Sequence, residues 1–248
     1  MIILKSKQEI EIMAESGKIL AEIMKELESK VKPGIKTKDL DKIAHELILN
    51  AGAKPSFLGY DGFPATLCTS LNEEVVHGVP SERILKEGDI LSLDLGVLWK
   101  GYHSDMAVTL PIGVVDYEVL RLIRVTKKSL KLAVNRIRPG ITFGDLGNTI
   151  QRYIESQGFG VIRDLCGHGI GRELHEDPQI FNYGKRKTGP EIKEGMVICV
   201  EPMVTMGKKT NLKKMDKWGY KMADDSLSCH FEHTIAITEQ RCIVLTKI

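Results

Sequence analysis

Two stretches of the chain, 85–94 (LKEGDILSLD) and 192–201 (IKEGMVICVE), repeat one pattern: a Lys-Glu-Gly turn, an apolar run and a final acid. The two acids, Asp94 and Glu201, lie 107 positions apart (201 − 94). A second pair, 32–40 (KPGIKTKDL) and 138–146 (RPGITFGDL), lies 106 positions apart (138 − 32). Because both matches share nearly one offset, we infer a duplicated helix-helix-strand unit whose two copies pack about a pseudo-two-fold axis.

Helix and strand signals follow the same order in both halves of the chain, about 1–113 and 114–248. A capping box from Ser6 to Glu9 predicts a first helix that ends at Pro33-Gly34, and Thr37 is the expected N-cap of a second helix. The second half predicts a long helix and then one capped by Thr142. Strand-forming runs are expected at 65–70, 89–98 and 106–110. The fold class is therefore α/β (α+β), which we expect to form a single domain over 1–248.

Composition excludes several classes of protein. Lys and Arg number 35 against 33 for Asp and Glu, so a net charge of +2 gives no strong reason to expect binding to nucleic acid or an acidic membrane. The five cysteines form no C-x-x-C pair, which favours a reducing compartment over a disulfide framework. No run approaches the roughly 20 apolar residues of a membrane span. We predict a cytoplasmic protein.

The duplication places four acids at matching positions. We expect Asp94 and Glu201 each to lie inside an apolar strand, and Asp105 and Glu232 each to follow on the next strand. One isolated acid would be read as a strand-edge charge or an ion-pair partner. Four acids buried together oppose their own ionisation unless bases or cations compensate them. Basic residues are sparse in these strands, and two divalent ions would balance four negative charges.

The stretch 166–178 (CGHGIGRELHEDP) carries two histidines with different expected roles. Gly167, Gly169 and Gly171 predict a loop or distorted strand rather than a helix. The spacing of His168 and His175 also departs from the His-Glu-x-x-His pattern of one zinc site. We expect His168 to provide a nitrogen ligand beside the four acids, a set that suits manganese, iron or cobalt as well as zinc.

With Asp94, Asp105, His168, Glu201 and Glu232 in this chain order, the sequence resembles the type-one methionine aminopeptidases over essentially its whole length. The segments SLNEEVVHGVP (70–80), GHGIGRELHEDP (167–178) and FEHTIAIT (231–238) carry the resemblance. It implies the pita-bread fold, a pseudo-symmetric arrangement around a curved antiparallel sheet. It also implies two divalent metal ions per chain (Co²⁺, Mn²⁺, Fe²⁺ or Zn²⁺). Asp94 would bind one ion, Asp105 and Glu232 would bridge both, and His168 with Glu201 would complete the second.

The same resemblance implies a dinuclear methionyl aminopeptidase that acts on nascent chains whose second residue is small (Ala, Gly, Ser, Thr, Pro, Val or Cys). A metal-activated water would attack the first peptide bond, and Glu201 would carry the proton to the leaving amine. His175 would hydrogen-bond the scissile carbonyl, and His77 would contact the backbone of the second residue. The expected methionine pocket consists of Phe57, Tyr60, Phe63, Cys68, His77, Leu174 and Trp218. Ordinary core packing is the alternative role for each aromatic residue.

Two other functions fit parts of the pattern. One is a proline-specific peptidase of the same fold, which would release proline-linked residues but no methionine. The other is a metal-free binding protein that uses this fold to bind nucleic acid or other proteins. The lysines 208, 209, 213 and 214 could make a transient ribosome contact, although such a run is more often a solvated surface. We expect a monomer without membrane contact, and the physiological metal stays open.

Overall fold

The chain alternates between helical segments and short strands, and the computed structural model describes residues 1–248. The helices are α1 (Lys7–Lys30), α2 (Thr37–Asn50), α3 (Tyr117–Arg136) and α4 (Phe143–Ser156), with a 3-10 turn η1 (Tyr60–Gly62). The first seven strands are β1 (Lys54–Pro55), β2 (Leu67–Leu71), β3 (Glu74–Val76), β4 (Ile90–Trp99), β5 (Tyr102–Pro111), β6 (Gly160–Val161) and β7 (Gly167–Gly169). They are followed by β8 (Glu176–Ile180), β9 (Val197–Val200), β10 (Met203–Thr205), β11 (Leu212–Lys214), β12 (Tyr220–Met222), β13 (Ser228–His230), β14 (Glu232–Ile237) and β15 (Cys242–Val244).

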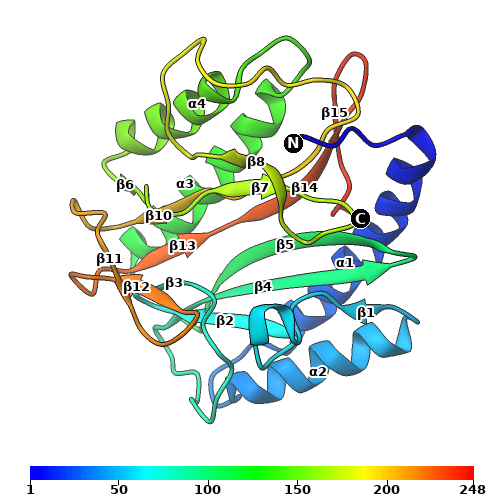
Figure 1. Ribbon diagram of the computed structural model, residues 1–248. Helices are drawn as coiled ribbons and strands as arrows, with labels where there is room; N and C mark the ends of the chain where they lie inside the picture. The colour runs from blue at the N-terminus through cyan, green and yellow to red at the C-terminus, as the bar shows by residue number, and fades with distance from the viewer.

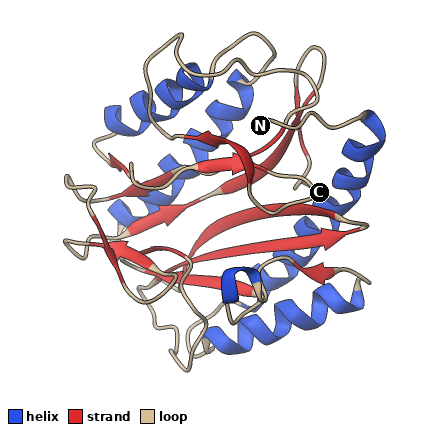
Figure 2. Ribbon diagram, viewed as in Figure 1, coloured by secondary structure: helices blue, strands red, loops and turns tan.

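A nine-stranded sheet forms the centre of the molecule. Its main path runs β1-β4-β5-β14-β9-β7-β8, with β2 paired to β4 and β15 paired to β14. The pairs along this path are antiparallel. Two three-stranded sheets, β13-β10-β6 and β11-β12-β3, flank it. The sheet is curved, and the helices gather behind and around it (Figures 1 and 2).

Helices α1 and α3 cover one face of the sheet because each presents an apolar stripe to it. In α1, Leu20, Met24 and Leu27 recur at helical spacing and are fully buried. The stripe of α3 includes Leu122 and Leu130, and both helices contribute to one large hydrophobic core with the strands. The opposite face of the sheet carries no long helix and is turned toward the viewer in Figure 1.

The predicted duplication is confirmed by matching backbone contacts in the two halves. In the first half, Gly34 N–H donates to Leu85 O at 2.8 Å, and in the second Gly140 N–H donates to Ile192 O at 3.1 Å. An isolated bridge between Lys36 and Ile84 likewise corresponds to one between residues 142 and 191. These contacts join the repeated Pro-Gly turns to the repeated Lys-Glu-Gly turns. The fold is the pita-bread fold that the sequence predicts.

Local details differ from the sequence prediction at one helix end. Ser6 and Thr142 cap their helices through complete capping boxes, as expected. The prediction for Thr37 was wrong, because Lys36 occupies the N-cap position and Thr37 is the first helical residue. The Thr37 hydroxyl instead donates to Ser81 O at 3.1 Å and accepts from Ser81 N–H at 2.9 Å. It binds a neighbouring loop to the helix rather than capping it.

Three strand boundaries also needed correction. The expected strand 106–110 is the later part of β5, which begins at Tyr102 and therefore includes Asp105. The runs 65–70 and 89–98 are shifted by one or two residues relative to β2 and β4. Glu201 was expected inside a strand, but it is the residue immediately after β9.

None of the helices combines the length and apolar composition that a membrane crossing requires.

Candidate metal centre

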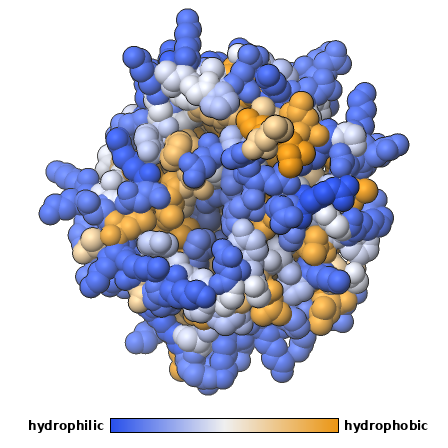
Figure 3. Space-filling view, in the orientation of Figure 1, coloured by the Kyte–Doolittle hydropathy of each residue, from blue (hydrophilic) through white to orange (hydrophobic).

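One cavity on the helix-free face of the sheet receives all five expected metal-binding side chains. The cavity has a volume of about 450 Å³ and is lined by Asp94, Asp105, His168, Glu201 and Glu232. Their strands, β4, β5, β14, β9 and β7, are consecutive neighbours in the sheet, with Glu201 directly after β9. Each of five adjacent strands thus contributes one side chain. The space-filling view of this face shows a hollow near its middle (Figure 3).

The glycines around His168 allow the chains on either side to approach closely. A Cβ on Gly167 would lie 2.3 Å from Cys199 O, and one on Gly169 would lie 2.1 Å from Asp177 O. Strand β7 is therefore inserted between β8 and β9 at a distance that only glycine permits. The sequence prediction of a distorted strand is confirmed, since the register of β7 shifts between these glycines.

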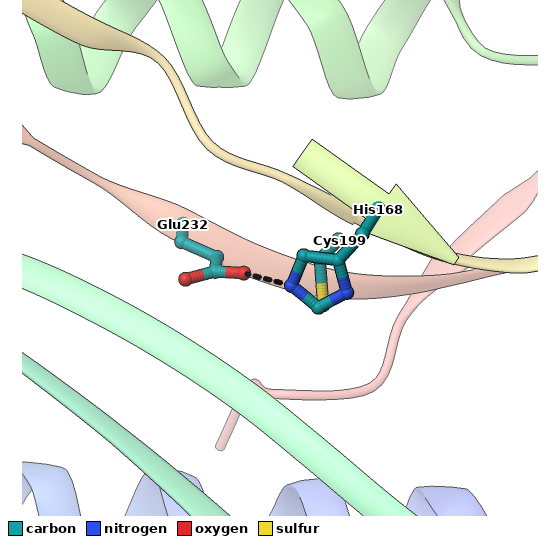
Figure 4. A group of neighbouring side chains, drawn as sticks. All are labelled: His168, Cys199 and Glu232. Atoms are coloured by element: carbon teal, nitrogen blue, oxygen red, sulfur yellow. Dashed lines mark ion pairs between the residues drawn. The ribbon is translucent and has the colours of Figure 1, made fainter. Parts of the chain in front are cut away.

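The tautomer of His168 follows from its hydrogen bond. Its Nδ1 lies 2.8 Å from Gly169 O, and because a carbonyl only accepts, Nδ1 carries the proton. The Nε2 lone pair then faces the carboxylates, 4.0 Å from Asp105, 3.8 Å from Glu201 and 3.9 Å from Glu232. Figure 4 shows the ring pointing toward Glu232, with the Cys199 thiol beside it. Burial lowers the pKa of His168 to about 3, so the ring is neutral near pH 7.

The carboxylates are buried close together without enough positive charge around them. Burial raises the pKa of Asp105, Glu201 and Glu232 well above the usual range, and repulsion by neighbouring carboxylates adds to the effect. The pKa of Asp94 is also raised by burial. Lys217 is the only Lys or Arg side chain lining the cavity. Divalent cations would satisfy these oxygens where the protein does not.

Several buried polar atoms of the cluster have no hydrogen-bond partner. Asp94 Oδ1 and Glu232 Oε1 are among them, and so is Nε2 of His230. Ligand atoms of Asp94, Asp105 and Glu232 lie within 4.8 Å of one another, as do those of Glu201, His230 and Glu232. Unpaired oxygen and nitrogen atoms converging at these separations suit metal binding.

His230 is the cluster member that the sequence reasoning missed. It lies on β13, and its Nε2 is 3.4 Å from Glu201 Oε2. Burial lowers the pKa of His230, and the nearby Asp94 carboxylate opposes this effect. The sequence offered one signal, the two-residue spacing of His230 and Glu232, which would place both on one face only if a single strand continued through them.

His175 and His77 line the same cavity beyond the acids. The His175 ring centroid is 4.3 Å from that of His168, and its Nδ1 lies 2.8 Å from the Tyr60 hydroxyl. Burial lowers the pKa of His175 to about 4 and raises the pKa of Tyr60. Tyr60 therefore keeps its proton and can donate to Nδ1, and in the tautomer that accepts this bond Nε2–H of His175 is free to donate.

His77 has a backbone conformation that is rare for a residue other than glycine. Its φ of 57° lies in the left-handed region, where a side chain costs about 1 kcal/mol or more. Its Nδ1 approaches Trp218 O at 3.4 Å, and burial lowers its pKa. This conformation fixes the ring at the junction between the cavity and the Trp218 segment.

The expected methionine-pocket residues all line this cavity as well. Phe63 and Trp218 pack edge to face, with ring centroids 5.9 Å apart. Burial raises the pKa of the Cys68 thiol well above its usual range, so it remains a neutral, polarizable wall. The set is Phe57, Tyr60, Phe63, Cys68, His77, Leu174 and Trp218, to which the structure adds Asp61, Val76, Lys217 and Tyr220. An apolar compartment thus adjoins the polar cluster.

A family model described as metallopeptidase family M24 matches residues 11–239 of the chain. The chain belongs to metallopeptidase family M24. A methionine aminopeptidase 1 of Bacillus subtilis is 45% identical over 248 residues, covering 100% of both chains. A crystal structure of the methionine aminopeptidase of Thermotoga maritima has a TM-score of 0.98 and 44% identity, again covering 100% of both chains.

The M24 assignment also bears on the two alternative functions. The prolidase of Pyrococcus furiosus has a TM-score of 0.80 and 27% identity, and the chain covers 66% of it. The match to methionine aminopeptidases is thus higher in both identity and coverage. As an M24 metallopeptidase the chain is a hydrolase that uses divalent metal, so the prediction of an enzyme is confirmed over a metal-free binding protein.

Proposed function

We propose that the chain, acting as a single catalytic domain, removes the N-terminal methionine from peptides and nascent proteins whose second residue is small. The expected second residues are Ala, Gly, Ser, Thr, Pro, Val and Cys. The observation that carries the proposal is the cavity itself, in which the five candidate metal-binding side chains from adjacent strands lie beside apolar side chains. The names of the full-length relatives support it.

Two divalent ions per chain fit the charge of the cluster, because four carboxylates surround His168 without a compensating cation. Asp94 would hold one ion, Asp105 and Glu232 would contact both, and His168 with Glu201 would hold the second. When bound, the ions supply an activated water and polarise the scissile carbonyl. The donor set accommodates Co²⁺, Mn²⁺, Fe²⁺ or Zn²⁺.

Protein side chains would orient the peptide and move its proton. His175 would donate Nε2–H to the scissile carbonyl oxygen, a role for which the contact of its Nδ1 with the Tyr60 hydroxyl orients the ring. Glu201 would carry the proton to the leaving amine, since burial and the nearby Asp94 carboxylate raise its pKa well above the usual range. His77 would contact the backbone of the second residue from its fixed position beside Trp218.

The apolar compartment would select methionine through shape and polarizability. Phe57, Phe63 and Cys68 are buried and provide a wall without charge. Leu174 is also buried, and its branched chain leaves the wall apolar. The second residue would lie near His77, where a bulky side chain would press on the segment carrying Trp218. Small second residues are therefore favoured.

Substitution of His168 tests the proposal directly. His168→Ala removes the neutral nitrogen donor and should reduce hydrolysis of a Met-Gly-Met-type peptide by at least about a hundredfold while the fold is retained. A matched control is His45→Ala, because His45 contacts Thr66 outside the cavity and should leave the rate unchanged. Full activity of His168→Ala, or release of proline-linked residues without release of methionine, would contradict the proposal.

A further inference from the structure

Besides His168, a second imidazole points into the metal centre. His230 is buried to 2% residual exposure, lines the cavity and has no hydrogen-bond partner at Nε2. We propose that His230 is a second nitrogen ligand of the centre, so that the centre has one imidazole on each side. The inference rests on the proposed metal-dependent function and adds to it a residue that determines which metals bind.

The two imidazoles lie close to opposite oxygens of the same two carboxylates, those of Glu201 and Glu232. His168 Nε2 lies 3.8 Å from Glu201 Oε1 and 3.9 Å from Glu232 Oε1. His230 Nε2 lies 3.4 Å from Glu201 Oε2 and 3.9 Å from Glu232 Oε2. Glu201 and Glu232 therefore each present one oxygen to each ring. An ion on the His230 side would find a nitrogen and two oxygens, the same three donors that the His168 side offers.

The separation between His230 and Glu201 matches two ligands of one ion. With metal–nitrogen and metal–oxygen bonds of about 2.1 Å, ligands at octahedral or tetrahedral angles are about 3.0 to 3.4 Å apart. The observed 3.4 Å falls in this range. It is long for a hydrogen bond from a ring N–H, for which about 2.7 to 3.2 Å is usual. The geometry thus favours a shared cation over a direct hydrogen bond.

Backbone contacts fix the position of His230 on β13 without occupying its Nε2. The Thr109 hydroxyl donates to His230 O at 2.7 Å and accepts from His230 N–H at 2.9 Å. Pairing with Met203 on β10 fixes the other side of the strand. The backbone that carries the ring is consequently fixed, and Nε2 remains available beside the acids that line the cavity.

A second nitrogen donor would change metal preference. Imidazole favours zinc, cobalt, iron and nickel, whereas carboxylate oxygen is sufficient for manganese. Loss of His230 should therefore weaken cobalt and zinc binding more than manganese binding. A residue that only supports packing would affect all these ions equally.

The experiment compares His230→Gln and His230→Asn with the unmodified protein. Gln extends an amide N–H toward the position of Nε2 and preserves a hydrogen-bond donor, but it removes the imidazole. Calorimetric titration with Co²⁺, Zn²⁺ and Mn²⁺ should show at least about a tenfold rise in Kd for Co²⁺ and Zn²⁺ in both variants, and a smaller rise for Mn²⁺. The visible absorption of the bound Co²⁺ should change as well.

His233→Asn is the matched control. His233 is three positions further along, on the opposite face of the sheet, where it lines a separate cavity and contacts Thr246. Its loss removes a partly buried imidazole without touching the metal cluster. The Kd for Co²⁺ and the Co²⁺ spectrum of this variant should remain those of the unmodified protein.

X-ray absorption of the Co²⁺-loaded unmodified protein gives a readout that needs no variant, since two imidazoles per chain should contribute to its outer-shell scattering. A count of one imidazole, or His230→Gln with unchanged affinities and an unchanged spectrum, would overturn the assignment of His230. If the unmodified protein bound none of the three metals, the proposed function itself would fail. Metal binding that depends on His168 but not on His230 would remove only this inference.

Discussion

Gly169→Ala probes the close approach that positions His168. Gly169 pairs with Glu176 on β8 and with Ile198 on β9, so both neighbours restrict it. The added methyl carbon would lie 2.1 Å from Asp177 O, whereas real contacts of this kind are rarely below 3.0 Å. The obstacle is a backbone atom and cannot rotate away. Strands β7 and β8 must therefore separate by about 0.9 Å (3.0 − 2.1).

The expected size of the effect follows from this displacement. Overpacking of a tight interior typically costs about 1 to 3 kcal/mol. For a chain of this size each kcal/mol lowers the melting temperature by about 2 to 4 °C, so Gly169→Ala should melt about 2 to 12 °C lower. His168 is the adjacent residue, and a misplacement of about 1 Å at a reacting centre can cost a hundredfold in rate.

Thermal unfolding with and without Co²⁺, together with kcat/KM on a Met-Gly-Met peptide, would measure both consequences. Gly219→Ala is the control, because a Cβ there would find its nearest atom at 3.4 Å, an ordinary contact distance. Its stability should stay within about 0.5 kcal/mol of the unmodified protein. If Gly169→Ala melted at the temperature of Gly219→Ala and kept full activity, the steric explanation of these glycines would be wrong.

Three further substitutions have defined outcomes. Tyr60→Phe removes the hydroxyl that orients His175 and should lower kcat/KM about two- to tenfold at unchanged metal affinity; an unchanged kcat/KM would exclude the orienting role. Hydrogen bonds from the Tyr102 hydroxyl and the Ser6 backbone N–H lower the pKa of the Glu9 carboxyl from 4.5 to about 2. This carboxylate therefore stabilises the fold above pH 4.5, and the contribution is lost as the pH falls toward 2. Glu9→Gln should therefore be about 1 kcal/mol less stable at pH 7 and equal to the unmodified protein near pH 2, as measured by denaturant unfolding; a constant difference would refute the titration argument. Lys5→Met leaves the buried Glu176 carboxylate unpaired and should cost about 3 kcal/mol, most of which Lys5→Met/Glu176→Met should restore; equal stability of the two variants would show that the ion pair does not matter.

The fold and most of the cluster could be predicted because the same sequence motif occurs in both halves of the chain. Asp94 and Glu201 end two copies of one motif, so each supports the placement of the other. Sheet order could not be obtained this way. That β14 pairs with β5 depends on contacts between residues more than 100 positions apart, which no local pattern encodes.

The missed features share a physical cause, which is competition between local and tertiary contacts. Thr37 has the residue type of an N-cap, but a nearby loop offers its hydroxyl both a donor and an acceptor. His230 stands two positions before Glu232, yet the chain changes from β13 to β14 between them. A spacing rule alone could not decide whether both side chains still shared one face.

The pairing of β5 with β14 has a consequence for how the molecule is held together. Strands β4 and β5 are matched over ten residue pairs, whereas β5 and β14 share two, Ala107 with Glu232 and Met106 with His233. Within the nine-stranded sheet, the first half of the chain thus meets the second along a narrow seam of main-chain bonds, and Asp105 and Glu232 lie on its two strands. A cation bound by both Asp105 and Glu232 would connect the two strands across the seam. Chelation should then loosen the junction between the halves first, and amide exchange at these few residues should accelerate before it does elsewhere in the sheet.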